Sequence, residues 1–321
     1  MKSVVLESAG NVKIEDMEEP GDIPEGYVKI RVQSVGICGS DVHYYLHGKI
    51  GDFVLRKPMI LGHETGGIAK SGGASIKKGS VVAVEPGIPC GKCIYCRTGR
   101  YNLCPDMRFF ATPPVDGSMV EHIVHPEGFV YSADGLTPDE ASLAEPLSVG
   151  VYAARMAHLG PDSGVLINGS GPVGILTAFA AESYGANVTV VDINPERIEY
   201  AGECGFSSCI NNKISRQFDS VFECSGYGHE YSIHRTARGG DLFLIGIGEE
   251  DGINPLMASI GGINIHGIFR YANTYPEAIR IIKRYRNRLA PFLRKHIDAD
   301  ELPGYLADGE YEKYLKTIVR I

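Results

Sequence analysis

The sequence has no tryptophan and no long apolar run. Its 321 residues contain no stretch that approaches the roughly 20 apolar residues needed by a membrane-spanning helix. There is no excess of positive charge, because 31 Lys and Arg residues stand against 39 Asp and Glu, for a formal net charge of −8. A chain with that balance offers no basic surface to nucleic acid or to an anionic membrane. We therefore expect neither kind of partner.

The amino-terminal sequence does not predict a signal peptide. The segment MKSVVLESAGNVKIEDMEEP has only a short apolar run and turns acidic at once. The composition, with 44% hydrophobic and 22% charged residues, is typical of a globular chain, and the length corresponds to about two domains. These features predict a cytoplasmic protein with a sizeable hydrophobic core.

The eight cysteines are too few and too unevenly spread for a disulfide scaffold. Four of them fall within fifteen residues, at Cys90, Cys93, Cys96 and Cys104. Four thiolates can surround one ion in the closed tetrahedral geometry of structural zinc. A ferredoxin-like iron–sulfur cluster is the alternative, but its last cysteine follows after three residues, whereas seven separate Cys96 from Cys104 here. The spacing therefore favours a structural zinc ion.

The texture of the chain changes near residue 145. Before it, short Val- and Ile-rich runs such as Tyr27–Val35 indicate an antiparallel or barrel-like β region. From Gly164, strands alternate with helices of 10–15 residues, which predicts a doubly wound parallel sheet and an α/β fold. We expect domains over 1–145 (with a metal lobe at about 86–106) and 146–270, and a return segment over 271–321 that completes the first domain.

A G-x-G-x-x-G motif lies between a predicted strand and helix, and its candidate cofactor residues are Gly169, Gly171, Val173 and Gly174. Glycines at this spacing allow a tight turn, close approach of a pyrophosphate and close packing of helix on strand. Asp192 follows eighteen residues after Gly174, where an acidic residue can bind the ribose hydroxyls of NAD and repel the extra phosphate of NADP. Arg197 could stack on adenine, pair with a phosphate or be solvated. The pattern favours NAD.

Four further ionisable residues stand in glycine-rich or turn-like contexts, at Cys38, His63, Glu64 and Glu145. A thiolate, an imidazole and a carboxylate are three ligands, and three ligands leave the open position that a catalytic zinc ion requires. These residues are far apart in the sequence, so the spacing alone does not demonstrate that they meet. Separate structural roles for the cysteine and the histidine stay open at this point.

Several segments together carry a family resemblance. GICGSDVHYYLHGKIGDFVLRKPMILGHE, the Cys90–Cys104 cluster, FFATPPVDGS, EPLSVG, GSGPVG and IFRYANTYP occur in the order and approximate spacing found in zinc-dependent medium-chain dehydrogenases. The sequence most resembles the polyol branch, the sorbitol and xylitol dehydrogenases. The resemblance covers nearly the whole chain and implies a GroES-like catalytic domain, split in sequence around a Rossmann domain.

The resemblance also implies roles for individual residues. Cys38 and His63 match ligands of the catalytic zinc, and Glu64 and Glu145 match two carboxylates that ligate that zinc or lie just behind it. Ser40 and His43 match a proton relay through the nicotinamide ribose. Positions that line the polyol pocket are matched by Tyr44, Glu145, Arg270 and Tyr271. Positions that contact the nicotinamide half of the cofactor are matched by Gly246, Ile247, Ile268 and Phe269.

The implied activity is hydride transfer from a secondary alcohol of a polyol to NAD, which gives a ketose, with one catalytic and one structural zinc. Two alternatives remain: a zinc dehydrogenase of threonine, an aldose or a simple secondary alcohol, and a non-enzymatic dinucleotide-binding protein. Relatives in the family are tetramers or dimers, which implies a homo-oligomer.

The chain is shorter than the family pattern in one place. Only KISRQF separates the predicted strands SSCINN and DSVFECSG, where the family has a crossover helix. Six residues are too few for the connection of about a dozen residues that parallel strands normally need. We expect the helix to be lost or replaced by an irregular crossing.

Overall fold

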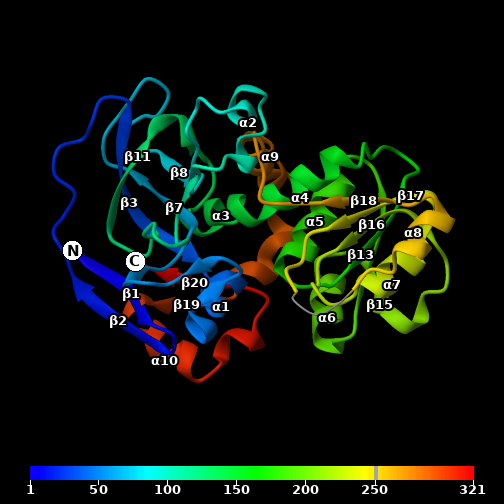
Figure 1. The fold of residues 1–321 in the computed structure, drawn as a ribbon. Helices are drawn as coiled ribbons and strands as arrows, with labels where there is room; N and C mark the ends of the chain where they lie inside the picture. Colours follow the sequence, from blue (N-terminus) through cyan, green and yellow to red (C-terminus); the bar gives the residue numbers. More distant parts are fainter. Residues whose placement is uncertain (249–251) are drawn as a thin grey trace. The chain divides into compact units, whose positions relative to one another are not determined.

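The computed structural model describes residues 1–248 and 252–321. They form two compact units, one made of Met1–Glu145 and Phe292–Ile321 and the other of Pro146–Pro291 (Figure 1). Residues 271–291, which the sequence analysis assigned to the return segment, lie in the second unit, so the chain re-enters the first unit at Phe292. In the described ranges, no helix combines the length and the apolar character needed to cross a bilayer.

The first unit is built on a seven-stranded sheet in which β3 (Tyr27–Gly36) is central. Along β3 the side chains of Val28, Ile30 and Val32 are buried at alternate positions, which is the period of a strand with one face in the core. β3 pairs with the amino-terminal strands and also, antiparallel, with β20 from the carboxyl end. The other strands are β7 (Glu64–Ala69), β8 (Val81–Val84), β11 (His122–Pro126), β12 (Val130–Ser132), β19 (Lys295–Asp298) and β20 (Thr317–Arg320).

Smaller elements complete this unit. A three-stranded sheet holds β1 (Lys2–Ser8), β2 (Asn11–Asp16) and β6 (Met59–Ile60). Two short antiparallel pairs are formed by β4 (Lys49–Ile50) with β5 (Phe53–Val54) and by β9 (Gly87–Ile88) with β10 (Arg108–Phe109). The helices are α1 (Gly39–His47), α2 (Ile94–Arg97), α3 (Pro138–Ser142) and α10 (Leu302–Ala307). The 3-10 turns are η1 (Tyr101–Leu103), η2 (Glu127–Phe129), η5 (Ala299–Glu301) and η6 (Glu310–Lys313).

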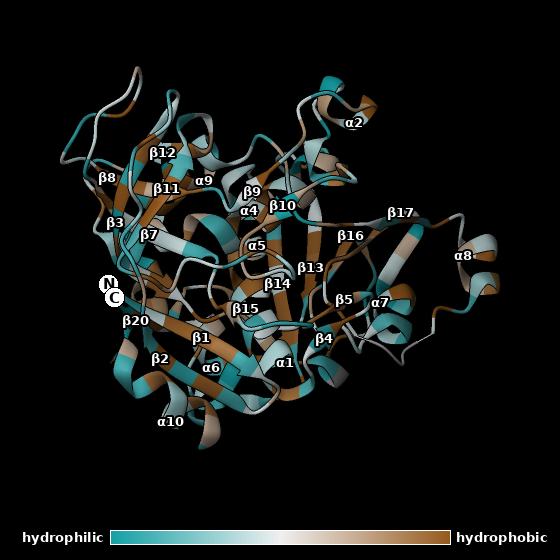
Figure 2. Cartoon of the chain, turned by 60° about the vertical axis from the view of Figure 1, so that its left-hand side comes forward, coloured by the Kyte–Doolittle hydropathy of each residue, from teal (hydrophilic) through white to brown (hydrophobic). Residues whose placement is uncertain are grey.

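The second unit contains a six-stranded parallel sheet in the order β15-β14-β13-β16-β17-β18. Its strands are β13 (Gly164–Asn168), β14 (Asn187–Asp192), β15 (Ser207–Ile210), β16 (Phe218–Glu223), β17 (Thr236–Leu244) and β18 (Asn264–Gly267). Figure 2 shows apolar residues along the central strands β13, β14 and β16, as expected for strands covered on both faces. The strand order reverses between β13 and β16, which is where ligands bind in open parallel sheets.

Helices accompany these strands. They are α5 (Pro172–Ser183), α6 (Pro195–Glu203), α7 (His229–Arg235), α8 (Pro255–Gly261) and α9 (Tyr275–Tyr285). Two elements span the boundaries between the units, α4 (Ala144–Met156) and η4 (Arg286–Leu293).

The connection from β15 to β16 is irregular, as the sequence predicted. It contains one 3-10 turn, η3 (Asn211–Lys213), in place of the family's helix. Tyr231 Oη donates a hydrogen bond of 2.8 Å to the Asn211 carbonyl, and Arg216 Nη2 donates one of 3.1 Å to Thr189 Oγ1. The Arg216 guanidinium also lies over the Phe218 ring, 4.5 Å from its centroid. Side-chain contacts therefore hold the connection between β15 and β16 in place, where the family resemblance implies a crossover helix.

The loop after β7 is bound by several hydrogen bonds to one carboxylate, that of Glu127. Glu127 accepts hydrogen bonds from the backbone N–H groups of Ser75, Ile76 and Ala74, at 2.6, 3.0 and 3.0 Å. Donation from these backbone groups lowers the pKa of Glu127 from its ordinary value of 4.5 to about 2. The ionised carboxylate thus satisfies three consecutive backbone N–H groups of this loop.

We predict that Glu127→Gln destabilises the first unit at pH 7, because an amide cannot accept all these bonds as a carboxylate does. The stabilisation by Glu127 is fully present above the unfolded pKa of 4.5 and is lost as the pH falls towards 2. Denaturant unfolding of both proteins from pH 7 to pH 3 checks this. A gap between their midpoints that stays constant over that range would contradict the assignment.

Candidate functional site

Three candidate metal ligands meet because β3 and β7 run antiparallel. Their register pairs Gly36 at the end of β3 with Glu64 at the start of β7. Cys38 lies two residues after the end of β3 and directly before α1, and His63 directly precedes β7. One donor atom from each of Cys38, His63 and Glu64 lies within 4.8 Å of the others. Sheet register thus assembles a thiol, an imidazole and a carboxylate from distant parts of the sequence.

Asp41 joins the two turns that carry these ligands, and sequence reasoning missed it. Its Oδ2 accepts the Cys38 N–H at 3.0 Å, its Oδ1 accepts the Gly62 N–H at 3.1 Å, and Oδ1 lies 3.9 Å from His63 Nδ1. Asp41 is the third residue of α1, where an acidic side chain commonly reaches back to cap a helix. That position was the available signal. The side chain is buried, so the cap is protected from solvent.

The two oxygens of Glu64 have different surroundings. Oε1 accepts a hydrogen bond of 2.7 Å from Nζ of Lys316, another residue that sequence reasoning missed. Oε2 is buried and has no hydrogen-bond partner. A Cβ atom at Gly36 would lie 2.0 Å from Oε2, so only glycine leaves room for this oxygen. A buried carboxylate oxygen without a partner, beside a thiol and an imidazole, fits a metal ion.

The charges around His63 outweigh its burial. Burial alone would lower the pKa of His63, but Cys38, Asp41 and Glu145 raise the pKa to about 10. Burial likewise opposes the charge of Lys316, while Glu64 and Cys38 hold the pKa of that lysine above its usual value. A metal ion at these ligands must therefore displace protons as it binds.

Glu145 is buried in α4, close enough to contribute to the raised pKa of His63. It lies outside the group of three donors within 4.8 Å of one another. The structure thus brings Cys38, His63 and Glu64 together as one set and leaves Glu145 as a neighbouring carboxylate.

The four clustered cysteines form a second set of donors, again with all sulfur atoms within 4.8 Å. The Cys93 and Cys96 sulfurs are 3.4 Å apart, and those of Cys90 and Cys96 are 4.0 Å apart. Backbone N–H groups of Lys92 and Cys93 donate to Cys90 Sγ and lower the pKa of that thiol to about 7. Backbone groups that point at sulfur favour thiolates, as a structural zinc ion requires.

Glu85 connects this lobe to the sheet, and sequence reasoning missed this residue too. Its carboxylate accepts the hydroxyl of Tyr101 from η1 at 2.7 Å and that of Tyr131 from β12 at 2.9 Å. Burial raises the pKa of Glu85 to about 7 against the effect of both hydroxyls. The lobe is therefore anchored by buried hydrogen bonds as well as by the chain itself.

Helix α1 carries the predicted relay residues on one face. Ser40 and His43 are three residues apart and both half-buried. The His43 ring lies 4.6 Å from the ring of exposed His47, one turn further along. Tyr44, predicted to line the substrate pocket, is 2% exposed and belongs to the hydrophobic core of the first unit.

In the second unit, the glycine motif joins β13 to α5. Gly169 has φ of +98°, which favours glycine, and a Cβ there would lie 2.7 Å from the Ser225 backbone nitrogen. A Cβ at Gly174 would lie 1.8 Å from the Gly169 carbonyl oxygen, so helix and strand approach as the motif requires. Gly171 is the residue before the helix, and Val173 lies in its first turn. The turn sits at the carboxyl end of β13, beside the reversal of strand order.

Asp192 ends β14 next to this turn. Its Oδ2 accepts the backbone N–H of Ser170 at 2.7 Å and the Ser170 hydroxyl at 3.1 Å, while Oδ1 accepts the Asn194 N–H at 2.9 Å. These bonds fix the carboxylate at the strand end. Arg197 is exposed, and its Nη1 lies 4.0 Å from the Cβ position of Gly171.

The remaining predicted residues follow β17 and β18. Gly246 must be glycine, because a Cβ there would lie 2.2 Å from the Gly226 nitrogen. Ile268 donates its N–H to the Leu244 carbonyl at 2.9 Å, whereas Ile247 and Phe269 are 74% and 46% exposed. The last two are Arg270, whose guanidinium lies 4.8 Å from the Phe269 ring centroid, and buried Tyr271. The exposed apolar side chains therefore stand at the carboxyl edge of the sheet.

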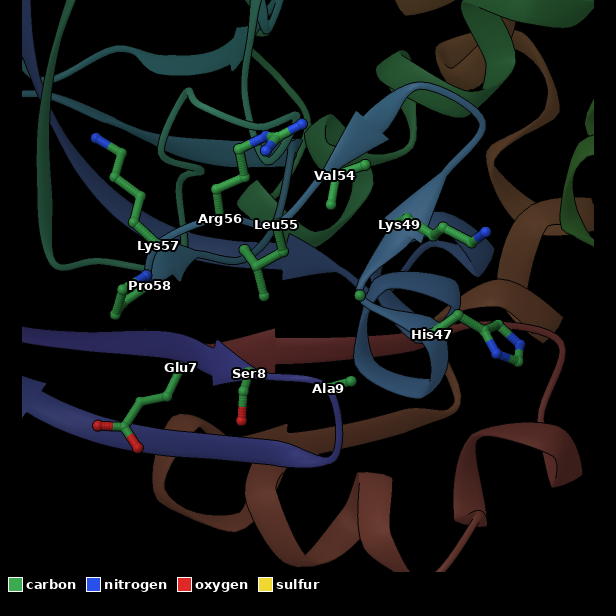
Figure 3. A pocket seen from close by; sticks show the side chains of 11 residues that line it. Glu7, Ser8, Ala9, His47, Lys49, Val54, Leu55, Arg56, Lys57 and Pro58 are labelled. Carbon is green, nitrogen blue, oxygen red and sulfur yellow. The ribbon is translucent and has the colours of Figure 1, made fainter.

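A cavity of about 380 Å³ in the first unit lies between the β1–β2 turn and residues 47–58. In Figure 3 its basic side chains, His47, Lys49, Arg56 and Lys57, spread around the rim and do not converge. None of the predicted site residues lines this cavity. It therefore adds nothing to the candidate site.

Comparisons with known proteins agree with this arrangement. A model of the alcohol dehydrogenase GroES-like domain matches residues 24–135, and one of zinc-binding dehydrogenases matches residues 172–284. The sorbitol dehydrogenase of Bacillus subtilis (strain 168) is 42% identical over 303 residues, which cover 88% of this chain and 86% of that protein. The chain is a zinc-dependent medium-chain dehydrogenase of the polyol branch. The family, the two-part fold class and the oxidoreductase class predicted from the sequence are confirmed.

Two further similarities are to enzymes that are named for other substrates. The L-idonate 5-dehydrogenase of Vitis vinifera is 36% identical, over 83% of this chain and 79% of that protein. The structure of 2R,3R-butanediol dehydrogenase from Bacillus subtilis aligns with a TM-score of 0.88 at 27% identity, covering 100% of this chain and 99% of that one. Membership of this enzyme family also argues against a non-enzymatic dinucleotide-binding protein.

We predict that Cys93→Ser lowers the zinc content from two ions per chain to one. Loss of a structural ion should cost about 3 kcal/mol or more in unfolding free energy, with unchanged relative rates on different alcohols. Metal analysis, thermal unfolding and initial rates check this. Cys209→Ser, outside the lobe, should keep both ions, whereas a stable Cys93→Ser protein with two ions would disprove the assignment.

Proposed function

We propose that this dehydrogenase oxidises a secondary alcohol of a sorbitol- or xylitol-type polyol to the ketose, with NAD as the hydride acceptor. The observation that carries the proposal is the Glu64 carboxylate, which has a buried oxygen without a partner and lies in one donor set with Cys38 and His63. A metal ion bound by this donor set would satisfy the buried oxygen, and a metal ion with three protein ligands can act on an alcohol.

In this proposal Cys38, His63 and Glu64 hold a catalytic zinc ion, and the four clustered cysteines hold a structural one. When bound at the three-ligand site, zinc supplies a Lewis acid that lowers the pKa of an alcohol. The thiolate and the carboxylate offset the two positive charges of the ion. Glu145, the neighbouring buried carboxylate, is assigned to water or to a substrate hydroxyl.

Proton removal is assigned to α1. Ser40 and His43 would carry the alcohol proton away from the substrate once the cofactor is bound, with the Ser40 hydroxyl as the first acceptor. The contact between the rings of half-buried His43 and exposed His47 supports an exit to solvent. Tyr44, Arg270 and Tyr271 are assigned to the polyol, whose several hydroxyls need polar partners.

NAD is preferred over NADP in this proposal because of Asp192. Its carboxylate is fixed by Ser170 and Asn194 beside the glycine turn, and its charge would repel a ribose phosphate. Arg197 is the nearby opposite charge that could bind such a phosphate. We assign it to the pyrophosphate or the adenine.

A second candidate is a zinc dehydrogenase of another secondary alcohol. The similarities to an L-idonate and a butanediol dehydrogenase favour it, and threonine or an aldose are further options. The fold and the zinc chemistry are the same in both candidates, so the substrate pocket decides between them.

We further propose a homo-oligomer, a dimer or a tetramer, in the cytoplasm. β18 is an edge strand of the parallel sheet, and the apolar side chains of Leu256, Ile260 and Ile265 near it are 61%, 62% and 39% exposed. Exposed apolar surface at a sheet edge is typical of an interface. The free thiols of the cysteine lobe need a reducing compartment.

The test of the activity is the initial rate of NAD and NADP reduction with sorbitol, xylitol, galactitol, L-idonate, 2,3-butanediol, threonine and glucose. We expect the highest kcat/KM with a polyol and NAD. Preference for another alcohol would keep the chemistry and overturn the substrate. If the protein carries two zinc ions and is inactive with every one of these alcohols, the proposal is wrong.

We predict that Asp192→Ala raises the KM for NAD about 10- to 100-fold, because charge-assisted hydrogen bonds to the ribose are lost. The KM for NADP should rise less or fall. The control is Glu196→Ala, which removes an exposed charge from the first turn of α6 and should leave the NAD/NADP ratio unchanged. Equal losses for both cofactors in Asp192→Ala would remove Asp192 from the ribose site.

A further inference from the structure

A buried lysine from the carboxyl-terminal segment touches the catalytic ligand set. Lys316 is 4% exposed, and its Nζ donates to Glu64 Oε1 at 2.7 Å and to the Ile37 carbonyl at 3.0 Å. Ile37 directly precedes Cys38 in the chain. One ammonium group therefore binds both the carboxylate ligand and the peptide bond that leads into the thiol ligand. Lysines are almost never fully buried unless they are paired, so this contact needs a reason.

Sheet pairing leaves Lys316 little freedom to be elsewhere. β20, which begins at the next residue, pairs with β3 so that Ile318 lies opposite Gly36, and Gly36 lies opposite Glu64 on its other side. The Ile37 N–H also donates to the Thr317 carbonyl at 3.0 Å. The backbone on both sides of the lysine is thus tied to the strand that leads to Cys38.

The lysine makes the two oxygens of Glu64 unequal. With Oε1 engaged, rotation of the carboxylate would break a buried, charge-assisted hydrogen bond. Oε2 remains the free oxygen, in space that exists because residue 36 has no side chain. The pairing therefore fixes one oxygen for the protein and leaves the other for an ion.

We infer that Lys316 is a positioning residue for the catalytic metal: it holds Glu64 through Oε1, so that Oε2 is the oxygen presented to the ion. The inference rests on the proposed function, which assigns zinc to Cys38, His63 and Glu64. It makes Lys316 act through Glu64, without contact with substrate or cofactor. Groups that orient metal ligands in this way typically contribute a factor of about 10 to 100 to metal affinity.

The test is competition for zinc between the holoenzyme and a chromogenic chelator. Lys316→Met should release the catalytic zinc at a chelator concentration about 10- to 100-fold lower than wild type. The zinc at Cys90–Cys104 is an internal reference and should be released as in wild type. Lys316→Arg, which keeps the charge and the donors, should recover most of the affinity.

A spectroscopic reading separates positioning from a merely structural role. With cobalt(II) in the catalytic site, the visible bands should shift in Lys316→Met, since the ligand field changes when Glu64 turns. The matched control is Lys313→Met, which removes an exposed lysine of the same segment, paired with Glu310 on η6. It should leave both the zinc affinity and the cobalt spectrum unchanged.

The outcomes are distinct. Wild-type affinity and an unshifted cobalt spectrum in a folded Lys316→Met protein would overturn the inference and leave the proposed function intact. Wild-type enzyme that binds zinc only at the cysteine lobe would overturn both. If Lys316→Met does not fold, Lys316→Leu takes its place in the same measurements with the same two readings, since it also removes both the donor and the charge.

Discussion

A buried ion pair between Lys316 and Glu64 is the contact on which the rest of the first unit depends. Taking two charges out of water costs several kcal/mol per ion, which is offset only by good geometry and further hydrogen bonds. Here the ammonium has the Glu64 carboxylate and the Ile37 carbonyl as partners, and the carboxylate keeps one oxygen unused. Stability of the fold alone does not account for such an arrangement. Binding of a metal ion by the remaining carboxylate oxygen, as proposed above, would account for it.

The pair also joins the two sequence segments that make up the first unit. The lysine and the glutamate are 252 residues apart, and the chain builds a complete parallel-sheet unit between them. Until β20 has paired with β3, Glu64 has no partner and the ligand set lacks its cation. Pairing of β20 with β3 thus brings Lys316 to the carboxylate of the proposed ligand set.

In the second unit, the candidate cofactor residues are brought together by the ends of neighbouring strands. In a parallel sheet all carboxyl ends lie at one edge, so the turn after β13 and the end of β14 become neighbours without long-range contacts. Ser170, inside the glycine motif, fixes the carboxylate of Asp192 before any ligand arrives. The irregular crossing between β15 and β16 alters how the sheet is covered, yet the strand order that creates this edge is kept.

The sequence by itself determined whatever depends on short separations: the four-cysteine lobe, the glycine turn with Asp192, the lost crossover helix and the change from β to alternating texture. The family resemblance pointed to Cys38, His63 and Glu64, but only the tertiary structure shows that their donor atoms lie close enough together to bind one ion. It also shows that Glu145 lies outside that group. It alone selected Lys316. The physical reason is that the register of β7 and β20 on β3 decides which distant side chains meet, and no local pattern encodes that register.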